Sequence, residues 1–186
     1  LRSMLLTMVS DSCPLLTCCV TCSARIMMLT RFLLPIALVL WGYTATVVAA
    51  PKVLVFGDSL SAAYGIPQTA GWVALLQSRL LESGYPHQVI NASVSGETTA
   101  GGKRRLPAQL ARHEPTVLIR ELGANDGLRG QSLAAMRANL SAMAELAQAS
   151  DASVLLPGMR IPSNYGALYT QDFHASFASV AKDHDL

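Results

Sequence analysis

Short apolar runs alternate with helix-like stretches from Val53 onward, and this alternation is the strongest constraint on the fold. The apolar runs are typical of strands that are buried on both faces, as in parallel sheets. They cover residues 53–56, 88–92, 116–122 and 153–156, and helical periodicity covers 72–83, 133–147 and 173–180. Because parallel neighbours need right-handed crossovers, this order predicts a three-layer α/β/α sandwich with a parallel sheet of flavodoxin-like type.

Composition supports one globular domain and excludes two other classes of protein. Hydrophobic residues make up 51% of the 186 residues and charged residues 14%, so an intrinsically disordered chain is excluded. The formal net charge is only +2 and no run of Lys and Arg occurs, which argues against a nucleic-acid-binding protein.

The segment before Pro51 predicts an export signal. Arg31 precedes a short apolar run at 32–41, which is followed by small residues ending at Ala50. These are the parts of a secretory signal peptide, and the run is well short of the ~20 residues that cross a bilayer. We therefore expect a signal peptide over 27–50 that is cleaved after Ala50, and a periplasmic or secreted domain over 51–186 with no membrane span. An uncleaved anchor is the alternative.

Residues 1–26 do not fit this scheme, because a signal peptide starts close to its charged segment. The chain opens with Leu1, whereas Met27 and Met28 stand where a start codon is expected. We expect the first 26 residues to be an over-extended reading frame or a cloning remnant. All four cysteines fall there, lack the second ligand pair of a zinc site and are assigned no function: Cys13, Cys18, Cys19 and Cys22.

Three residues suited to acyl-transfer chemistry follow three successive predicted strands, at the sheet edge where such folds bind ligands. Ser59 follows the first strand on a turn that is expected to enter a helix, with the positive end of the helix nearby. Gly96 follows the second strand and lets a backbone N–H approach a ligand. Asn125 follows the third and offers an amide donor. Together they predict a serine nucleophile in an oxyanion hole formed by the Ser59 and Gly96 N–H groups and the Asn125 amide.

Each of these segments also has an ordinary structural interpretation as a turn. Their joint order at successive strand ends favours a hydrolase. The alternative is a non-catalytic flavodoxin-like module that binds a phosphate or acyl ligand at 57–61. The repeated glycines of phosphate-binding loops are absent from this sequence, which counts against that alternative.

The same segments resemble the SGNH/GDSL hydrolase family over about residues 52–186, and in particular its bacterial periplasmic thioesterases, lysophospholipases and arylesterases. The matching blocks are Gly57-Asp58-Ser59-Leu60, Gly96 in a Ser-Gly-Glu-Thr context, and Gly123-Ala124-Asn125-Asp126. The resemblance implies an enzyme that cleaves carboxylic esters or thioesters through an acyl-Ser59 intermediate, without a metal or cofactor.

The resemblance also implies roles for residues around the nucleophile. Asp58 is expected to brace the turn rather than act as an acid. Residues 127–131, with Gly127, Leu128 and Arg129, match a loop that lines the acyl site in this family. Tyr165 is expected either to contact the acyl chain or to pack in the core or at the rim.

The last block of the family, Asp-x-x-His, does not occur in the sequence. His87 and His113 lie in predicted loops that lead into strands, His174 lies in the last helix and His184 at its end, so none is expected to be catalytic. We expect a truncated sequence that lacks the last strand, its closing helix and the catalytic Asp and His. A polypeptide that ends at Leu186 is then expected to be poorly soluble and nearly inactive.

Overall fold

The computed structural model describes residues 49–186 of the chain. The expected over-extended N-terminus at 1–26, its cysteines and nearly all of the expected signal peptide lie outside the described residues. Among the helices of residues 49–186, none is long and apolar enough to cross a membrane.

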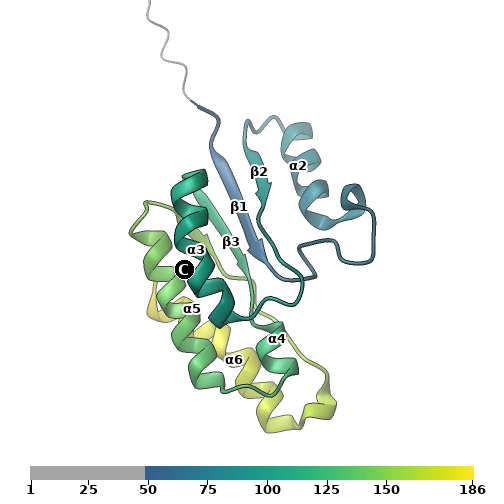
Figure 1. Cartoon of the computed structure of the whole chain (residues 1–186), viewed down its shortest axis with the longest axis vertical. Helices are drawn as coiled ribbons and strands as arrows, with labels where there is room; N and C mark the ends of the chain where they lie inside the picture. Colours follow the sequence, from purple (N-terminus) through teal and green to yellow (C-terminus); the bar gives the residue numbers. More distant parts are fainter. Residues whose placement is uncertain (1–48) are drawn as a thin grey trace, which may run out of the picture. The chain divides into compact units, whose positions relative to one another are not determined.

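A single parallel sheet of four strands forms the centre of the domain (Figure 1). The strand order is β2-β1-β3-β4, so β1 and β3 are central and the other two strands are edges. The strands are β1 Lys52–Gly57, β2 Gln88–Asn91, β3 Val117–Glu121 and β4 Ser153–Leu155. The predicted parallel sheet is confirmed, and each predicted strand end lies within one residue of the observed end.

The larger of two cores lies between the sheet and helices α3, α5 and α6, which span Thr99–His113, Leu133–Gln148 and Ala167–Asp183. Strand β1 contributes alternate residues to this core, because successive side chains of a strand point to opposite faces. Its largest members include Leu54 and Phe56 of β1, Leu106 and Leu110 of α3, Met136, Leu140 and Met143 of α5, and Phe173 and Phe177 of α6.

Helix α2, Trp72–Glu82, covers the opposite face of the sheet. Val53 and Val55 of β1 point to this side and pack in one cluster with Ile119 of β3 and Val73 of α2. The sheet therefore lies between two helical layers, and the predicted three-layer α/β/α sandwich is confirmed.

Helix α3 is not predicted by the periodicity of the sequence. It contains Gly101, Gly102 and Pro107, which are unfavourable inside helices. Packing explains one of these residues, since a Cβ at Gly102 would lie 2.5 Å from Cδ1 of Leu122. Close contact with the sheet thus requires glycine at a position where helix propensity disfavours it.

One buried cation departs from the apolar packing of the larger core. Arg120 of β3 is 0% exposed and pairs in register with Phe56. Its Nη1 donates to the backbone oxygen of Leu140, whereas Nε and Nη2 have no hydrogen-bond partner among the described residues. Burial lowers the pKa of Arg120 to about 10. One hydrogen bond does not compensate the desolvation of a cation, so this side chain destabilises the fold.

We predict that Arg120→Leu raises the free energy of unfolding by roughly 1–4 kcal/mol, because it replaces an incompletely paired buried cation with an apolar side chain. Urea denaturation of the two proteins measures the difference. The matched control is Arg104→Leu at an exposed position of α3, which is expected to change stability by no more than about 0.5 kcal/mol. A less stable Arg120→Leu variant would contradict this account.

Candidate active site

The segments that follow β1 and β2 are joined by two hydrogen bonds. The backbone N–H of Gly57 donates to Oγ of Ser93 at 3.0 Å. The N–H of Val94 donates in turn to the carbonyl of Gly57, also at 3.0 Å. These bonds extend the pairing of β1 and β2 beyond the last ladder residues and bring their polar segments together.

Asn125 joins the segment after β3 to both of the others. Its Nδ2 donates to Oδ2 of Asp58 at 3.1 Å and to the backbone oxygen of Glu97 at 3.0 Å. Asp58 immediately precedes Ser59, and Glu97 immediately follows Gly96. The three segments that carry Ser59, Gly96 and Asn125 therefore meet at the carboxyl edge of the sheet.

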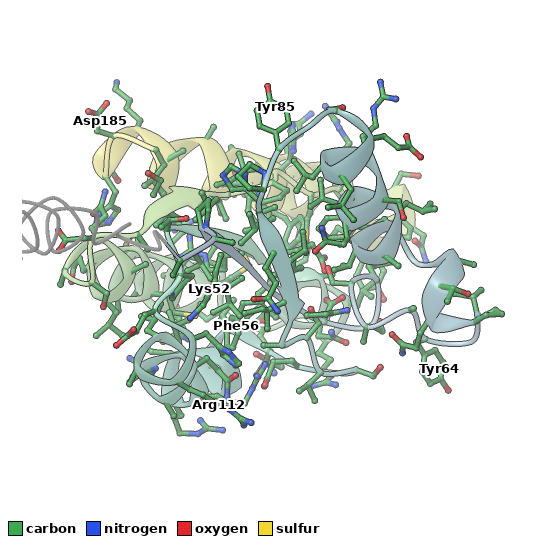
Figure 2. The ribbon with its side chains drawn as sticks, turned by 90° about the horizontal axis from the view of Figure 1, so that it is seen from above. Lys52, Phe56, Tyr64, Tyr85, Arg112 and Asp185 are labelled. Carbon is green, nitrogen blue, oxygen red and sulfur yellow. The ribbon has the colours of Figure 1, made fainter. Side chains whose placement is uncertain are left out.

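Ser59 is half-buried at the start of a series of turns over residues 59–65. The N–H of Ala62 donates to the carbonyl of Asp58 at 2.9 Å, which is a single helix-like bond. Ala63, however, has a positive φ of 55°, and no α-helix begins before Trp72 in this part of the domain. Tyr64 is 77% exposed and points away from the domain (Figure 2). The expectation that a helix begins beside Ser59 is therefore wrong, and this segment does not supply the positive helix end that the expectation included.

Asp58 makes the contacts of a bracing residue. Its Oδ1 accepts from the N–H of Leu60 at 3.0 Å, and its Oδ2 accepts from Asn125. The residue is 1% exposed, and burial raises the pKa of its carboxyl, with a smaller contribution from the negative charge of Asp126. Both carboxylate oxygens are thus occupied within the turn and its neighbour, as the bracing interpretation requires.

Glu121, the last residue of β3, lies beneath the same turn. Its Oε2 accepts from Oγ of Ser61 at 2.7 Å and lies 3.4 Å from the N–H of Asp58. Burial raises the pKa of Glu121 to about 7, and the nearby charge of Asp58 adds to the shift. Sequence reasoning missed this residue, although an acidic residue within a predicted buried strand is the signal that identifies it.

Asp126 fixes helix α3 against the short helix α4, Ala124–Leu128. Its two carboxylate oxygens accept from the N–H and the hydroxyl of Thr99, at 2.8 and 2.6 Å. Both residues are buried. This contact, which the sequence alone does not reveal, holds the start of α3 next to the segment that carries Asn125.

Gly96 adopts a positive φ of 78°, a conformation that L side chains rarely take. The nearest atom to a Cβ at this position would be Nη2 of Arg129, at 3.8 Å, so the space in front of it is open. The same nitrogen donates to the carbonyl of Gly96 at 3.2 Å. Arg129, which the resemblance places in the acyl-site loop, therefore contacts the expected oxyanion segment.

The two segments expected to line the acyl site are in contact with each other. The hydroxyl of Tyr165 donates to the carbonyl of Leu128 at 3.0 Å. The hydroxyl of Tyr169 of α6 donates to the carbonyls of Gly127 and Gln131, each at 3.2 Å. Sequence reasoning missed this residue. Leu128 is 44% exposed and Tyr165 is 38% exposed, so both leave apolar surface open at this end of the domain.

None of the hydrogen bonds that the four histidines make within residues 49–186 involves Ser59. The carbonyl of His113 accepts from Nζ of Lys52 at the start of β1, and His113 ends α3 instead of lying in the predicted loop. The carbonyl of His184 accepts from Gln148 at the end of α5, and Nδ1 of His174 lies 3.0 Å from the carbonyl of Met159. His87 directly precedes β2. Within residues 49–186, no three His, Cys, Asp or Glu side chains are grouped to hold a metal.

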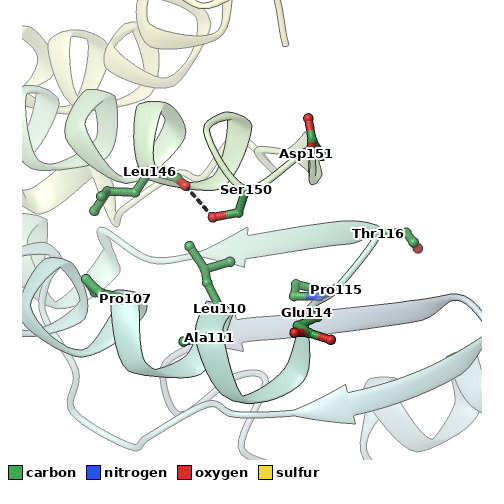
Figure 3. Close-up of a pocket in the computed structure, with 9 residues that line it drawn as sticks. All are labelled: Pro107, Leu110, Ala111, Glu114, Pro115, Thr116, Leu146, Ser150 and Asp151. Carbon is green, nitrogen blue, oxygen red and sulfur yellow. Dashed lines mark hydrogen bonds between the residues drawn. The ribbon is translucent and has the colours of Figure 1, made fainter.

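A pocket of about 460 Å³ lies between the C-terminal part of α3 and the end of α5 (Figure 3). These ends lead into the starts of β3 and β4, so the pocket lies at the opposite edge of the sheet from Ser59. Its lining residues are Pro107, Leu110, Ala111, Glu114, Pro115, Thr116, Leu146, Ser150 and Asp151. It therefore takes no part in the serine-centred site.

A parallel sheet whose polar segments meet at the carboxyl edge defines an α/β domain with a candidate site for acyl transfer. Residues 55–186 match the GDSL-like lipase/acylhydrolase family, and the chain belongs to that family. Membership confirms the resemblance inferred from the motifs and makes this an enzyme domain that acts on ester bonds.

Named relatives support the same assignment. Esterase TesA of Pseudomonas aeruginosa is 49% identical over 150 residues, which are 78% of this chain and 75% of the relative. Thioesterase 1/protease 1/lysophospholipase L1 of Escherichia coli is 40% identical over 138 residues, covering 74% of this chain and 65% of the relative.

Solved structures share the fold. The crystal structure of TesA matches with a TM-score of 0.71 at 49% identity, over 72% of this chain and 74% of that one. The psychrotrophic esterase EstA from Pseudoalteromonas sp., in a structure inhibited by monoethylphosphonate, matches with a TM-score of 0.70 at 46% identity, over 72% and 73%.

The raised pKa of Glu121 predicts a pH-dependent contribution to stability. Between its ordinary pKa of 4.5 and about 7, the folded protein binds more protons at this carboxyl than the unfolded chain does. The contribution of Glu121 to the free energy of unfolding therefore falls as the pH rises through this window. Glu121→Gln removes the dependence, so the variant should gain stability relative to the parent protein between pH 4 and pH 8.

Urea denaturation at several pH values measures that difference. Glu145→Gln, on the exposed side of α5, serves as the control, and its difference from the parent is expected to stay nearly constant. A constant difference for Glu121→Gln as well would show that the carboxyl titrates normally in the folded protein.

Proposed function

We propose that this protein hydrolyses carboxylic esters or thioesters through an acyl-Ser59 intermediate. The observation that carries the proposal is the position of Asn125, which is hydrogen-bonded to both the Ser59 turn and the Gly96 segment. An oxyanion hole needs donors from separate segments around one point, and this side chain holds the segments together.

In the first step, Oγ of Ser59 attacks the acyl carbonyl carbon, and the proton of the hydroxyl passes to a base. The carbonyl oxygen becomes an oxyanion, which accepts hydrogen bonds from the N–H groups of Ser59 and Gly96 and from the Asn125 amide. Collapse of this intermediate expels the alcohol or thiol, which takes up the proton. Water then attacks the acyl-enzyme in the same way and releases the carboxylic acid.

Both amide hydrogens of Asn125 are already donated within the described residues. We propose that the bond to Asp58 persists during turnover and that the hydrogen bonded to the Glu97 carbonyl turns to the oxyanion. Asp58 then fixes the orientation of the Asn125 amide, while the second N–H of that amide moves from the Glu97 carbonyl to the oxyanion.

The proposal assigns the base to the Asp-x-x-His block of the family, which does not occur in residues 1–186. The hydrogen bonds of His87, His113, His174 and His184 support this assignment, since none of those within the described residues joins a histidine to Ser59.

The acyl chain is proposed to lie along the surface formed by residues 127–131 and Tyr165. Their mutual hydrogen bonds and the exposed apolar surfaces of Leu128 and Tyr165 support this placement. The relatives do not fix whether the leaving group is an alcohol or a thiol, because one is named an esterase and another a thioesterase and lysophospholipase.

The proposed location is the periplasm or the extracellular medium. The signal-like pattern of residues 27–50 supports export, with cleavage after Ala50. The domain proposed to act there is 51–186, which contains no cysteine to mispair in an oxidising compartment.

We predict that Ser59→Ala in the full-length protein abolishes turnover of a p-nitrophenyl ester and labelling by a fluorophosphonate probe, because both require the nucleophilic oxygen. Ser78→Ala is the control, since Ser78 is an exposed residue of α2 whose hydroxyl donates to the carbonyl of Ala74 in the same helix. Retained turnover in Ser59→Ala would contradict the proposal. A parent protein that is never labelled but still binds an acyl ligand would instead support a non-catalytic binding module.

For Asn125→Ala we predict a fall in kcat of about 10²–10³-fold with little change in KM, because an oxyanion donor acts mainly in the transition state. Steady-state kinetics on the same ester measure both constants. If KM rises while kcat stays constant, the amide binds the substrate and does not stabilise the oxyanion.

A further inference from the structure

The nucleophile turn rests on a carboxyl group that the proposed reaction does not use. Glu121 is 7% exposed, and its Oε2 accepts from the hydroxyl of Ser61 at 2.7 Å, with the N–H of Asp58 at 3.4 Å. Ser59 lies between these two residues in the chain. Both sides of the nucleophile are therefore tied to one buried oxygen atom at the end of β3.

We propose that Glu121 is a positioning residue, which fixes the orientation of Ser59 by holding the turn at Asp58 and Ser61 and does so best as a neutral carboxyl. This inference rests on the proposed function, since it concerns the orientation of the same nucleophile. Glu121 itself does not contact the substrate.

Rigid support is provided by the strand beneath the turn. Glu121 pairs in register with Gly57, the last residue of β1, so the carboxyl is fixed by a central strand of the sheet. Without such support the turn would be flexible, and its movement would displace both Oγ and the N–H of Ser59 from their positions in the site. Displacement of reacting groups by ~1 Å costs up to about 10²-fold in rate.

The electrostatic surroundings favour the neutral form of Glu121. The ionisable group that faces it is Asp58, whose buried carboxyl adds negative charge, and Asp126 acts in turn on Asp58. The ion pairs found within residues 49–186 join Arg79 to Glu82 and Arg105 to Glu97, so no ion pair there neutralises these acids. Arg120, the neighbour on β3, bonds to Leu140 in the core on the other face.

Ionisation of Glu121 also opposes the proposed chemistry. An added negative charge beneath the turn repels the oxyanion that develops next to the Ser59 N–H. The second oxygen, Oε1, is buried and has no hydrogen-bond partner within the described residues, so a charge on the group is poorly solvated. A neutral acceptor satisfies the same donors without this repulsion.

The test compares Glu121→Gln and Glu121→Leu with the matched pair Glu145→Gln and Glu145→Leu on exposed α5, in the full-length protein with a p-nitrophenyl ester. Glu121→Leu removes the acceptor, and kcat is expected to fall about 10–100-fold with KM nearly unchanged. Glu121→Gln, which keeps a neutral acceptor, is expected to restore most of kcat. Both Glu145 variants are expected to match the parent protein.

A pH profile separates positioning from simple stabilisation. The ratio of kcat/KM in Glu121→Gln to that in the parent is expected to be constant below pH 6 and to rise at least about threefold above pH 7, where the parent carboxyl ionises. This measurement remains decisive if Glu121→Leu does not fold. A constant ratio, or a Gln variant as slow as the Leu variant, overturns the inference.

Ser59→Ala, measured in parallel, distinguishes a failure of the proposed function from a failure of the positioning role of Glu121. If Ser59→Ala keeps its turnover, the proposed function fails. If Ser59→Ala is inactive while the Glu121 variants behave like the Glu145 variants, only the positioning role fails.

Discussion

The candidate site depends on the side chain of Asn125, because its amide group joins three strand ends that are far apart in the sequence. A parallel sheet brings these ends to one edge but leaves the loops after them free to diverge. The two hydrogen bonds of Asn125, to Asp58 and to Glu97, restrict that freedom. The fold thus supplies the approximate position of each segment, and one amide sets their final arrangement.

Much of the fold follows from the sequence, because the two central strands contain largely buried apolar runs, at 53–56 in β1 and 117–119 in β3. Helix α3 does not follow, since Gly101, Gly102 and Pro107 disfavour a helix that tertiary packing nevertheless requires. The helix expected after Ser59 is absent for a related reason. There the chain satisfies its hydrogen bonds through Asp58 and Glu121 and turns away from helical geometry at Ala63.

The residues that carry the proposed chemistry were recognisable because short motifs contain them. The supporting residues were not, since Glu121 and Asp126 act across 63 and 27 positions of sequence, on Asp58 and Thr99. Contacts of this length leave no local pattern. Only the acidic character of Glu121 in a strand with an apolar start hints at such a role. An acidic residue at a strand end is explained equally well without such a role, so the hint is weak.

Three carboxyl groups, those of Asp58, Glu121 and Asp126, are buried at the carboxyl edge of the sheet, where the charge of Asp126 raises the pKa of Asp58 and the charge of Asp58 raises that of Glu121. Buried groups of like charge oppose folding, so this edge of the sheet costs stability where the proposed reaction takes place. Apolar substitutions here would relieve this repulsion but would also remove the acceptors of Ser61 and Thr99, on which the nucleophile turn and the start of α3 depend. Efforts to raise thermal tolerance without loss of activity are better directed at Arg120, whose buried side chain bonds to Leu140 in the larger core.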